Sequence, residues 1–131
     1  MSAETEYPID PVRLGGIIQF IQHAERLKST LRSGHTSQGR PESTAEHSWR
    51  LCLLVTLLDR ELGDCDRLKL IKMCIIHDLG EAISGDVPAI YQSTDDGRAE
   101  REKADLMTLC APLPDDLRAE IMELWTDYSE G

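Results

Sequence analysis

Two histidines and two acidic residues are spaced in a way that suits metal binding and water activation. His77 and Asp78 are adjacent and follow the apolar run MCII, and Glu81 lies one helical turn beyond His77. His47 precedes His77 by thirty positions. A neutral imidazole and a carboxylate side by side at the end of a buried segment suit a divalent metal ion. If the backbone stays helical up to Glu81, its carboxylate faces the same pocket, where it could act as a general base.

These residues also have an ordinary structural explanation. A single histidine on a helix is more often structural or solvent-facing than a metal ligand, and a His-Asp dipeptide arises readily by chance. Glu81 is equally compatible with a solvated carboxylate or a helix cap. The residue types alone leave metal binding and a structural role both open.

Helical periodicity predicts the elements that must position these residues. The expected helices cover about 11–30, about 44–62, a stretch from near 66 to His77, about 97–110, and a stretch after Pro114. Residues 31–42 are polar and rich in Gly and Ser, which predicts a loop. No alternating apolar and polar run of strand length occurs. We therefore expect an all-α protein, a compact bundle of about five helices.

The second and third of these helices carry the chemistry. Ser43 and Glu46 form a capping box ahead of WRLCLLVTLL, whose nearly continuous apolar run predicts a central helix contacted on several sides. In the third helix, Leu68 and Ile75 are among the apolar residues expected to face inward. A helix, a short turn and a second helix folding back would bring His47 to the His77-Asp78 pair.

Composition restricts the class of protein and its partners. A length of 131 residues predicts one domain over residues 1–131, and a net charge of −10 argues against non-specific nucleic-acid binding. No stretch approaches the roughly 20 apolar residues that span a bilayer, so we expect no membrane partner. The N-terminus MSAETEYPID has no signal-peptide pattern, and the four cysteines form no CxxC. We expect a cytoplasmic protein with reduced, buried thiols.

Two blocks of the sequence resemble the HD-domain hydrolases, and within them the 5′-deoxynucleotidase branch. Residues 40–49, RPESTAEHSW, are similar to an E-S-x-x-E/D-H block, and residues 77–86, HDLGEAISGD, are similar to an HDxxE-xxx-GD block. The later stretch 113–125, with L-P-x-D-L-R and E-L-W, also fits. The resemblance covers roughly residues 15–128 and implies a homodimeric HD-domain helical bundle.

The resemblance implies a role for each site residue. His47, His77 and Asp78 would bind one divalent metal ion, which would act as a Lewis acid on the phosphate and orient the attacking water. Glu81 would position or deprotonate that water. Ligand type does not select among cobalt, manganese, iron, zinc and magnesium.

Other residues match positions that contact the substrate in the family. Arg32 matches an arginine that binds the substrate phosphate, which suits a bidentate guanidinium, and Arg40 is a weaker candidate for the same anion. Asp86 matches an aspartate that accepts a hydrogen bond from a sugar hydroxyl, although a turn or helix-cap role is equally compatible. His35 stands where the family has tryptophan in R-x-G-W, and it offers less apolar area against a sugar ring.

The resemblance also implies a fourth metal ligand that this sequence does not contain. In the family it is an aspartate on a helix after the Trp125 stretch, and the sequence ends at Gly131. The C-terminal family helices are therefore absent. We expect either a longer protein with that aspartate about fifteen residues further on, or a naturally short domain that keeps three ligands. Asp127 and Asp86 are the only substitutes nearby, with no geometric reason for either to reach.

The resulting hypothesis is a metal-dependent phosphohydrolase that removes the 5′-phosphate from deoxyribonucleoside monophosphates by direct attack of water. One alternative is another HD phosphohydrolase that acts on deoxynucleoside triphosphates or cyclic-nucleotide phosphodiesters. Another is a non-catalytic nucleotide-binding or interaction module that lacks the last metal ligand. Activity on a panel of nucleotides, together with metal content, distinguishes the three.

Overall fold

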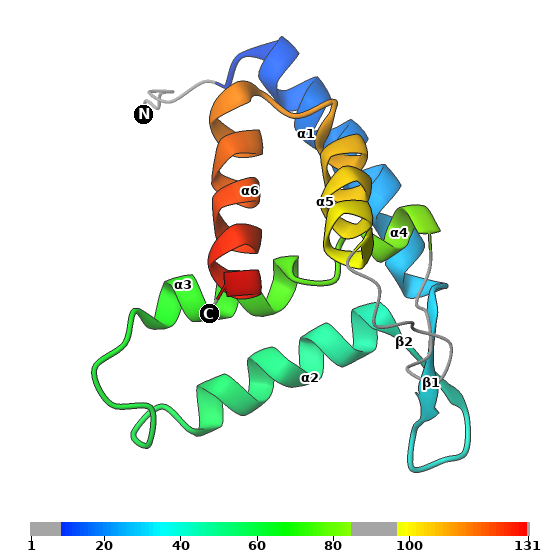
Figure 1. Ribbon diagram of the computed structural model, residues 1–131, viewed down its shortest axis with the longest axis vertical. Helices are drawn as coiled ribbons and strands as arrows, with labels where there is room; N and C mark the ends of the chain where they lie inside the picture. The colour runs from blue at the N-terminus through cyan, green and yellow to red at the C-terminus, as the bar shows by residue number, and fades with distance from the viewer. Residues whose placement is uncertain (1–8, 85–96, 131) are drawn as a thin grey trace, which may run out of the picture.

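The computed structural model describes residues 9–84 and 97–130, and helices dominate this part of the chain (Figure 1). The expected helical fold is confirmed. In chain order the elements are α1 (Pro11–Ala24), the 3-10 helix η1 (Glu25–Lys28), β1 (Leu31–His35), β2 (Pro41–Ser43), α2 (Thr44–Leu57), α3 (Arg67–Ile76), α4 (Glu81–Ser84), α5 (Gly97–Cys110) and α6 (Asp115–Glu130). None of the described helices is long and apolar enough to cross a membrane.

The helices form two groups that meet at the end of α3. α5 and α6 lie side by side, and α2 and α3 run across their lower ends as an antiparallel pair (Figure 1). α1 begins near the upper end of α6 and runs along α5. This arrangement leaves the start of α2 and the end of α3 facing each other beside the short helix α4.

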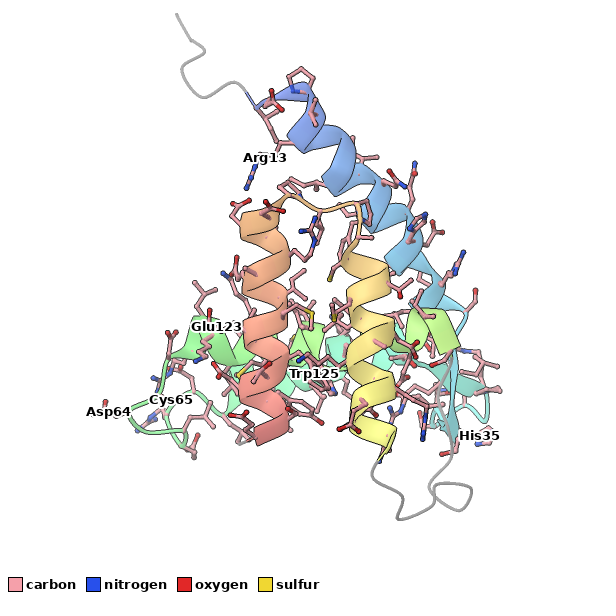
Figure 2. The ribbon with its side chains drawn as sticks, turned by 45° about the horizontal axis from the view of Figure 1, so that its top comes forward. Arg13, His35, Asp64, Cys65, Glu123 and Trp125 are labelled. Carbon is pink, nitrogen blue, oxygen red and sulfur yellow. The ribbon has the colours of Figure 1, made fainter. Side chains whose placement is uncertain are left out.

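The hydrophobic core lies between α5 and α6 and extends to the end of α3. Leu106 and Leu109 of α5 are almost completely buried, and Trp125 lies on the side of α6 that faces α5 (Figure 2). The full set of buried apolar residues is Leu27, Ile76, Leu79, Ala82, Leu106, Leu109, Cys110, Leu113, Leu124 and Trp125. Ile76 and Leu79 belong to it, so the core anchors the backbone on both sides of the His77-Asp78 pair.

The predicted start of α2 is confirmed. The Ser43 side chain accepts a hydrogen bond from the backbone N–H of Glu46, and the Glu46 carboxylate accepts one from the backbone N–H of Ser43. This reciprocal capping satisfies two N–H groups that would otherwise lack partners at the helix start. It also fixes the first turn of α2, which carries His47.

The prediction of a loop over residues 31–42 is wrong. β1 and β2 form an antiparallel hairpin in which Leu31 lies opposite Ser43 and His35 lies opposite Pro41, with an irregular register between them. Gly39 has a φ of 85°, a conformation that glycine adopts at little cost in a turn. All but one residue of β1 are exposed, so the strand has no buried face to impose an alternating pattern.

The expectation of a central second helix is also wrong. α2 ends at Leu57 rather than near 62, and among its described neighbours it packs mainly on α3, η1 and β2. Its exposed apolar residues include Trp49, Leu53, Leu54 and Leu57. Leu68 and Ile75 of α3, expected to face inward, are exposed as well. A continuous apolar run indicates which residues could be buried, but not how many sides the rest of the fold covers.

Candidate metal centre

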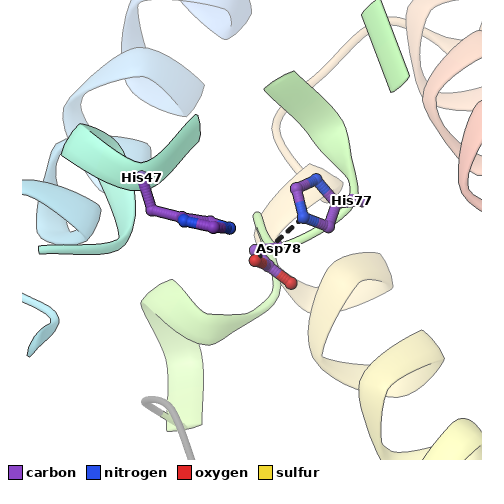
Figure 3. A group of neighbouring side chains, drawn as sticks. All are labelled: His47, His77 and Asp78. Atoms are coloured by element: carbon purple, nitrogen blue, oxygen red, sulfur yellow. Dashed lines mark ion pairs between the residues drawn. The ribbon is translucent and has the colours of Figure 1, made fainter. Parts of the chain in front are cut away.

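Three of the predicted site residues meet where α2 faces the end of α3. His47 lies in the first turn of α2, His77 caps the end of α3, and Asp78 follows it (Figure 3). One potential ligand atom from each of the three lies within 4.8 Å of the others. This group is the metal cluster discussed below. It arises because the α2–α3 pair folds back on itself, as the thirty-residue spacing predicts.

The ring of His77 is held by both of its nitrogens. Nδ1 lies 2.9 Å from the backbone carbonyl oxygen of Cys74, and Nε2 lies 3.0 Å from Oδ2 of Asp78. A carbonyl oxygen and an ionised carboxylate both only accept, so the protonated ring donates to both, from Nδ1 to Cys74 and from Nε2 to Asp78. Loss of the Nε2 proton keeps the Nδ1–H bond to the carbonyl and leaves Nε2 able to bind a metal ion. A backbone carbonyl that holds one imidazole nitrogen in this way is the common arrangement behind a metal-ligating histidine.

Charge and burial act in opposite directions on the pair formed by His77 and Asp78. Burial disfavours the charged imidazolium, but the hydrogen bond and charge of Asp78 outweigh it and raise the pKa of His77. Burial likewise disfavours the carboxylate, but the hydrogen bond from His77 outweighs it and lowers the pKa of Asp78. At His47, burial and the nearby Arg32 charge lower the pKa, so its ring is neutral at neutral pH.

The donors of the cluster fit a divalent metal ion. Two imidazole nitrogens and one carboxylate oxygen suit several transition metals, and neutral histidine is the form that ligates. All three side chains are partly or largely shielded from solvent, with exposed fractions of 26% for His47, 9% for His77 and 20% for Asp78. The donor set does not identify the metal.

Glu81 lies beside the cluster, but not on a continuation of α3. After Ile76 the backbone makes successive tight turns, and α4 begins at Glu81. The condition of a continuous helix from His77 to Glu81 is therefore not met, and α3 ends next to His77 as expected. The Glu81 backbone N–H donates to the Asp78 carbonyl at 3.0 Å, and the Glu81 carboxyl group also lies within hydrogen-bond reach of the Asp78 side chain. The Thr44 hydroxyl donates to Oε1 of Glu81 at 2.8 Å.

Arg32 is the candidate phosphate ligand that the fold brings to the cluster. From β1 its guanidinium lies 3.7 Å from Oδ2 of Asp78 and 3.8 Å from Oε1 of Glu42. Glu42 was not among the predicted site residues. Its Oε1 also lies 3.9 Å from Nδ1 of His47, so one carboxylate faces both the arginine and a potential metal ligand.

Two other predicted substrate contacts, Arg40 and His35, are not brought to the cluster. Arg40 is exposed and forms a two-point ion pair with Glu46, with nitrogen–oxygen distances of 3.1 and 2.8 Å. Hydrogen bonds from Arg40 and from the Ser43 backbone lower the pKa of Glu46 to about 2. Arg40 thus supports the start of α2. His35 lies at the exposed far end of β1 (Figure 2), and Asp86 lies outside the described residues.

Sequence reasoning missed three groups that contact the site. Glu42 and Thr44 lie on either side of the capping residue Ser43. Polar residues are common at a helix start, so nothing in the sequence marks these two as part of a site. Tyr128 was predicted only as part of an apolar helix face, yet its ring lies 5.0 Å from that of His77, measured between centroids. Burial and the charge of Asp78 raise the pKa of Tyr128. Only the fold, which returns the end of α6 to α3, identifies this contact.

Comparison with known proteins identifies the family. The HD domain family model matches residues 24–131, which include the whole metal cluster. The chain belongs to the HD domain family. That range includes the His77-Asp78 pair, which is the histidine–aspartate dipeptide of the second sequence block described above.

Relatives of this HD domain are named for phosphate chemistry. A protein of Dictyostelium discoideum named 5′-deoxynucleotidase HDDC2 is 28% identical, and the match covers 89% of this chain and 66% of that protein. The Xenopus laevis protein of the same name is 30% identical, with 86% and 56% covered. This HD-domain chain therefore spans less than two thirds of the length of these curated relatives.

A solved structure shares the fold. The crystal structure of a predicted metal-dependent phosphohydrolase from Magnetospirillum magnetotacticum has a TM-score of 0.80 and 31% sequence identity, and the match covers 91% of this chain and 61% of that one. The similarity includes most of this HD domain.

Proposed function

We propose that this HD domain is part of a metal-dependent phosphohydrolase that removes the 5′-phosphate from deoxyribonucleoside monophosphates. The observation that carries the proposal is the metal cluster, in which His47, His77 and Asp78 present ligand atoms within 4.8 Å of one another. Membership of the HD domain family and the names of the relatives support the substrate class.

Each side chain has a proposed role that follows from its position. His47, His77 and Asp78 hold a divalent metal ion, with the Cys74 carbonyl fixing the His77 ring. When bound, the metal supplies Lewis-acid stabilisation of charge on the phosphate. Glu81 takes a proton from the attacking water, and Arg32, which lies next to Asp78 of the metal cluster, binds a phosphate oxygen. Asp86 remains a proposed sugar contact on the strength of the family resemblance.

The substrate class is tested by phosphate release. The protein is incubated with deoxyribonucleoside and ribonucleoside monophosphates in the presence of cobalt, manganese, iron, zinc or magnesium. We expect metal-dependent release that is faster from the deoxy series. Release only from deoxynucleoside triphosphates or cyclic nucleotides would replace the proposed substrate, and release from none of them would reject the enzymatic proposal.

The roles of the residues are tested by two variants that should both lose turnover but differ in whether they still bind metal. Glu81→Ala removes the proposed base, so turnover falls by about 100-fold or more while metal still binds. His77→Ala removes a ligand, so both metal binding and turnover are lost. Metal binding is followed by the rise in melting temperature on metal addition, since a ligand of the folded state stabilises it. Unchanged turnover in Glu81→Ala would contradict the role of Glu81.

We also infer a homodimer, on the basis of the family resemblance, and a cytoplasmic location, on the basis of four cysteines that form no CxxC. The exposed apolar residues of α2 and α3 are compatible with a covered surface. Light scattering during size-exclusion chromatography measures the mass in solution, and a monomer at assay concentration would contradict the homodimer.

A further inference from the structure

We propose that Thr44 is a positioning residue that holds the Glu81 carboxylate in its catalytic orientation. The inference rests on the proposed function, because it assumes that Glu81 is the base. It concerns a residue at the start of α2 that lies 37 positions before Glu81 in the sequence and is not one of the three residues of the metal cluster.

The contact between the two residues is short and shielded. The Thr44 hydroxyl donates to Oε1 of Glu81 at 2.8 Å, a normal length for a hydrogen bond to a carboxylate. The side chain of Thr44 is completely buried, with an exposed fraction of 0%. Hydrogen bonds to charged groups in shielded positions are stronger than those at the surface, because water does not compete for the donor.

Three features restrict the position of the Thr44 hydroxyl. Its backbone N–H donates to the Thr30 carbonyl at 2.7 Å, which ties the start of α2 to the residue before β1. The capping box formed by Ser43 and Glu46 fixes the same turn. Threonine is also β-branched, which restricts rotation about its Cα–Cβ bond. The hydroxyl is therefore a fixed donor rather than a mobile one.

Glu81 needs such a donor more than a residue inside a long helix would. It is the first residue of α4, a helix of only four residues that follows a series of turns. A glutamate side chain has several rotatable bonds, so the backbone position of Glu81 at the start of α4 does not by itself fix the direction of its carboxylate. A fixed donor on one carboxylate oxygen determines the direction of the other, and a misplaced catalytic group can cost up to about 100-fold in rate.

The experiment compares Thr44→Val with Thr44→Ser. Valine keeps the branched shape and removes the donor, so we expect kcat to fall about 10-fold or more while KM for the monophosphate stays within about twofold. Serine keeps the donor and should restore most of kcat. Thr56→Val is the matched control, since Thr56 is an exposed threonine of the same helix whose hydroxyl donates to the Cys52 carbonyl at 2.8 Å.

A double-mutant cycle shows whether Thr44 acts through Glu81. In the Glu81→Ala background, Thr44→Val should cause no further loss of kcat. Equal kcat in Thr44→Val and Thr56→Val would overturn the inference, and so would a full additional loss in the double variant. If the wild-type protein hydrolyses no phosphate ester under any condition, the proposed function fails and the inference fails with it.

A second cycle tests the contact without any activity. The free energies of unfolding in urea are measured, without metal, for the wild type, Thr44→Val, Glu81→Ala and the double variant. We expect the two single losses not to add, because either substitution removes the same hydrogen bond. Additive losses would overturn the inference even for an active enzyme. A third outcome is also possible: the losses do not add and the wild type is active, but kcat in Thr44→Val is unchanged. The hydrogen bond would then have only a structural role, and this result would overturn the inference as well.

Discussion

At the scale of single residues, charge explains why the site suits both a cation and a phosphate. Glu42, Asp78 and Glu81 contribute three carboxylates, and Arg32 contributes one guanidinium in contact with two of them. When all are ionised, three negative charges and one positive charge leave a local charge of −2. A divalent cation balances that charge, and Arg32 then remains available to attract a phosphate.

Ser48 provides a prediction about stability. Its hydroxyl is buried, with 8% of the residue exposed, and has no hydrogen-bond partner among the described residues. Since burying an unpaired hydroxyl is unfavourable, Ser48→Ala should leave the free energy of unfolding unchanged or raise it by about 1 kcal/mol. Ser43→Ala is the contrasting variant, because it removes the α2 cap and should lower the same quantity by about 1 kcal/mol. Urea unfolding measures both, and a clear loss in Ser48→Ala would indicate a missing partner.

The cysteines provide a prediction about reactivity. Cys65 is exposed, whereas Cys110 is fully buried in the core and burial raises its pKa to about 11. The thiolate is the reactive form, so Cys110 should react with iodoacetamide at pH 8 at least about 100-fold more slowly than Cys65. Timed labelling followed by peptide mass spectrometry measures both rates. In urea the two should converge, and similar rates in the native protein would contradict the burial of Cys110.

The sequence allowed the cluster to be predicted, but not its surroundings. His47, His77 and Asp78 were predicted because two helices that fold back could bring them together, and because both sequence blocks resemble those of the HD-domain hydrolases. Thr44 and Glu42 were not found, because a helix start rich in polar residues is fully explained by capping. Cys65 was wrongly expected to be buried, since composition does not tell which thiol lies in the α2–α3 link.

At the scale of elements, cap signals predicted helix starts better than apolar runs predicted burial. Ser43 caps α2 and Asp66 caps α3, as their sequence contexts indicate. Capping depends on residues within one turn and is therefore visible locally. Burial of Leu53 or Ile75 depends on which distant element covers that face of the helix. The neighbouring residues in the sequence do not show which element that is. The β1–β2 hairpin was missed for a different reason, because β1 has no buried face to impose an alternating pattern.

Two adjacent glycines in α1 provide a matched pair of substitutions. A Cβ on Gly16 would lie 2.3 Å from the backbone oxygen of Pro112, whereas a Cβ on Gly15 would meet nothing within 4 Å. Gly16→Ala should therefore lower the free energy of unfolding by about 1–3 kcal/mol, because α1 must move away from the α5–α6 link. Gly15→Ala should raise it by about 0.5–1 kcal/mol, because alanine favours a helix. Urea unfolding measures both, and equal effects would contradict the close approach.

At the scale of the whole molecule, an ion pair joins the first described helix to the last one. The Arg13 guanidinium forms two hydrogen bonds to the Asp116 carboxylate, at 2.8 and 3.0 Å, and connects α1 with the start of α6. The hydrogen bond from Arg13 lowers the pKa of Asp116. A carboxyl group with a lower pKa in the folded state stabilises the fold above its unfolded pKa, and this contribution disappears as pH falls through the folded pKa.

The pH dependence of unfolding tests this connection. The free energy of unfolding of the wild type should fall as pH decreases from about 5 to below the folded pKa of Asp116, and the fall should be smaller in Arg13→Gln. Arg60→Gln, at an exposed arginine of the α2–α3 link, is the control and should follow the wild type. Both surface groups are exposed, so the difference should be small and should shrink at high salt. Identical pH profiles for Arg13→Gln and wild type would contradict the prediction.

The position of the site residues along the chain has a consequence for folding. Glu42, Thr44, His47, Asp78 and Glu81 all lie in residues 42–81, whereas Tyr128, whose ring contacts that of His77, lies on α6. Closing the shorter loop costs less chain entropy, and N-terminal segments leave the ribosome first. The ligand-bearing helices can therefore pair during synthesis before α6 exists. Early metal capture would then stabilise a nascent intermediate, and the contact between the Tyr128 and His77 rings would form afterwards.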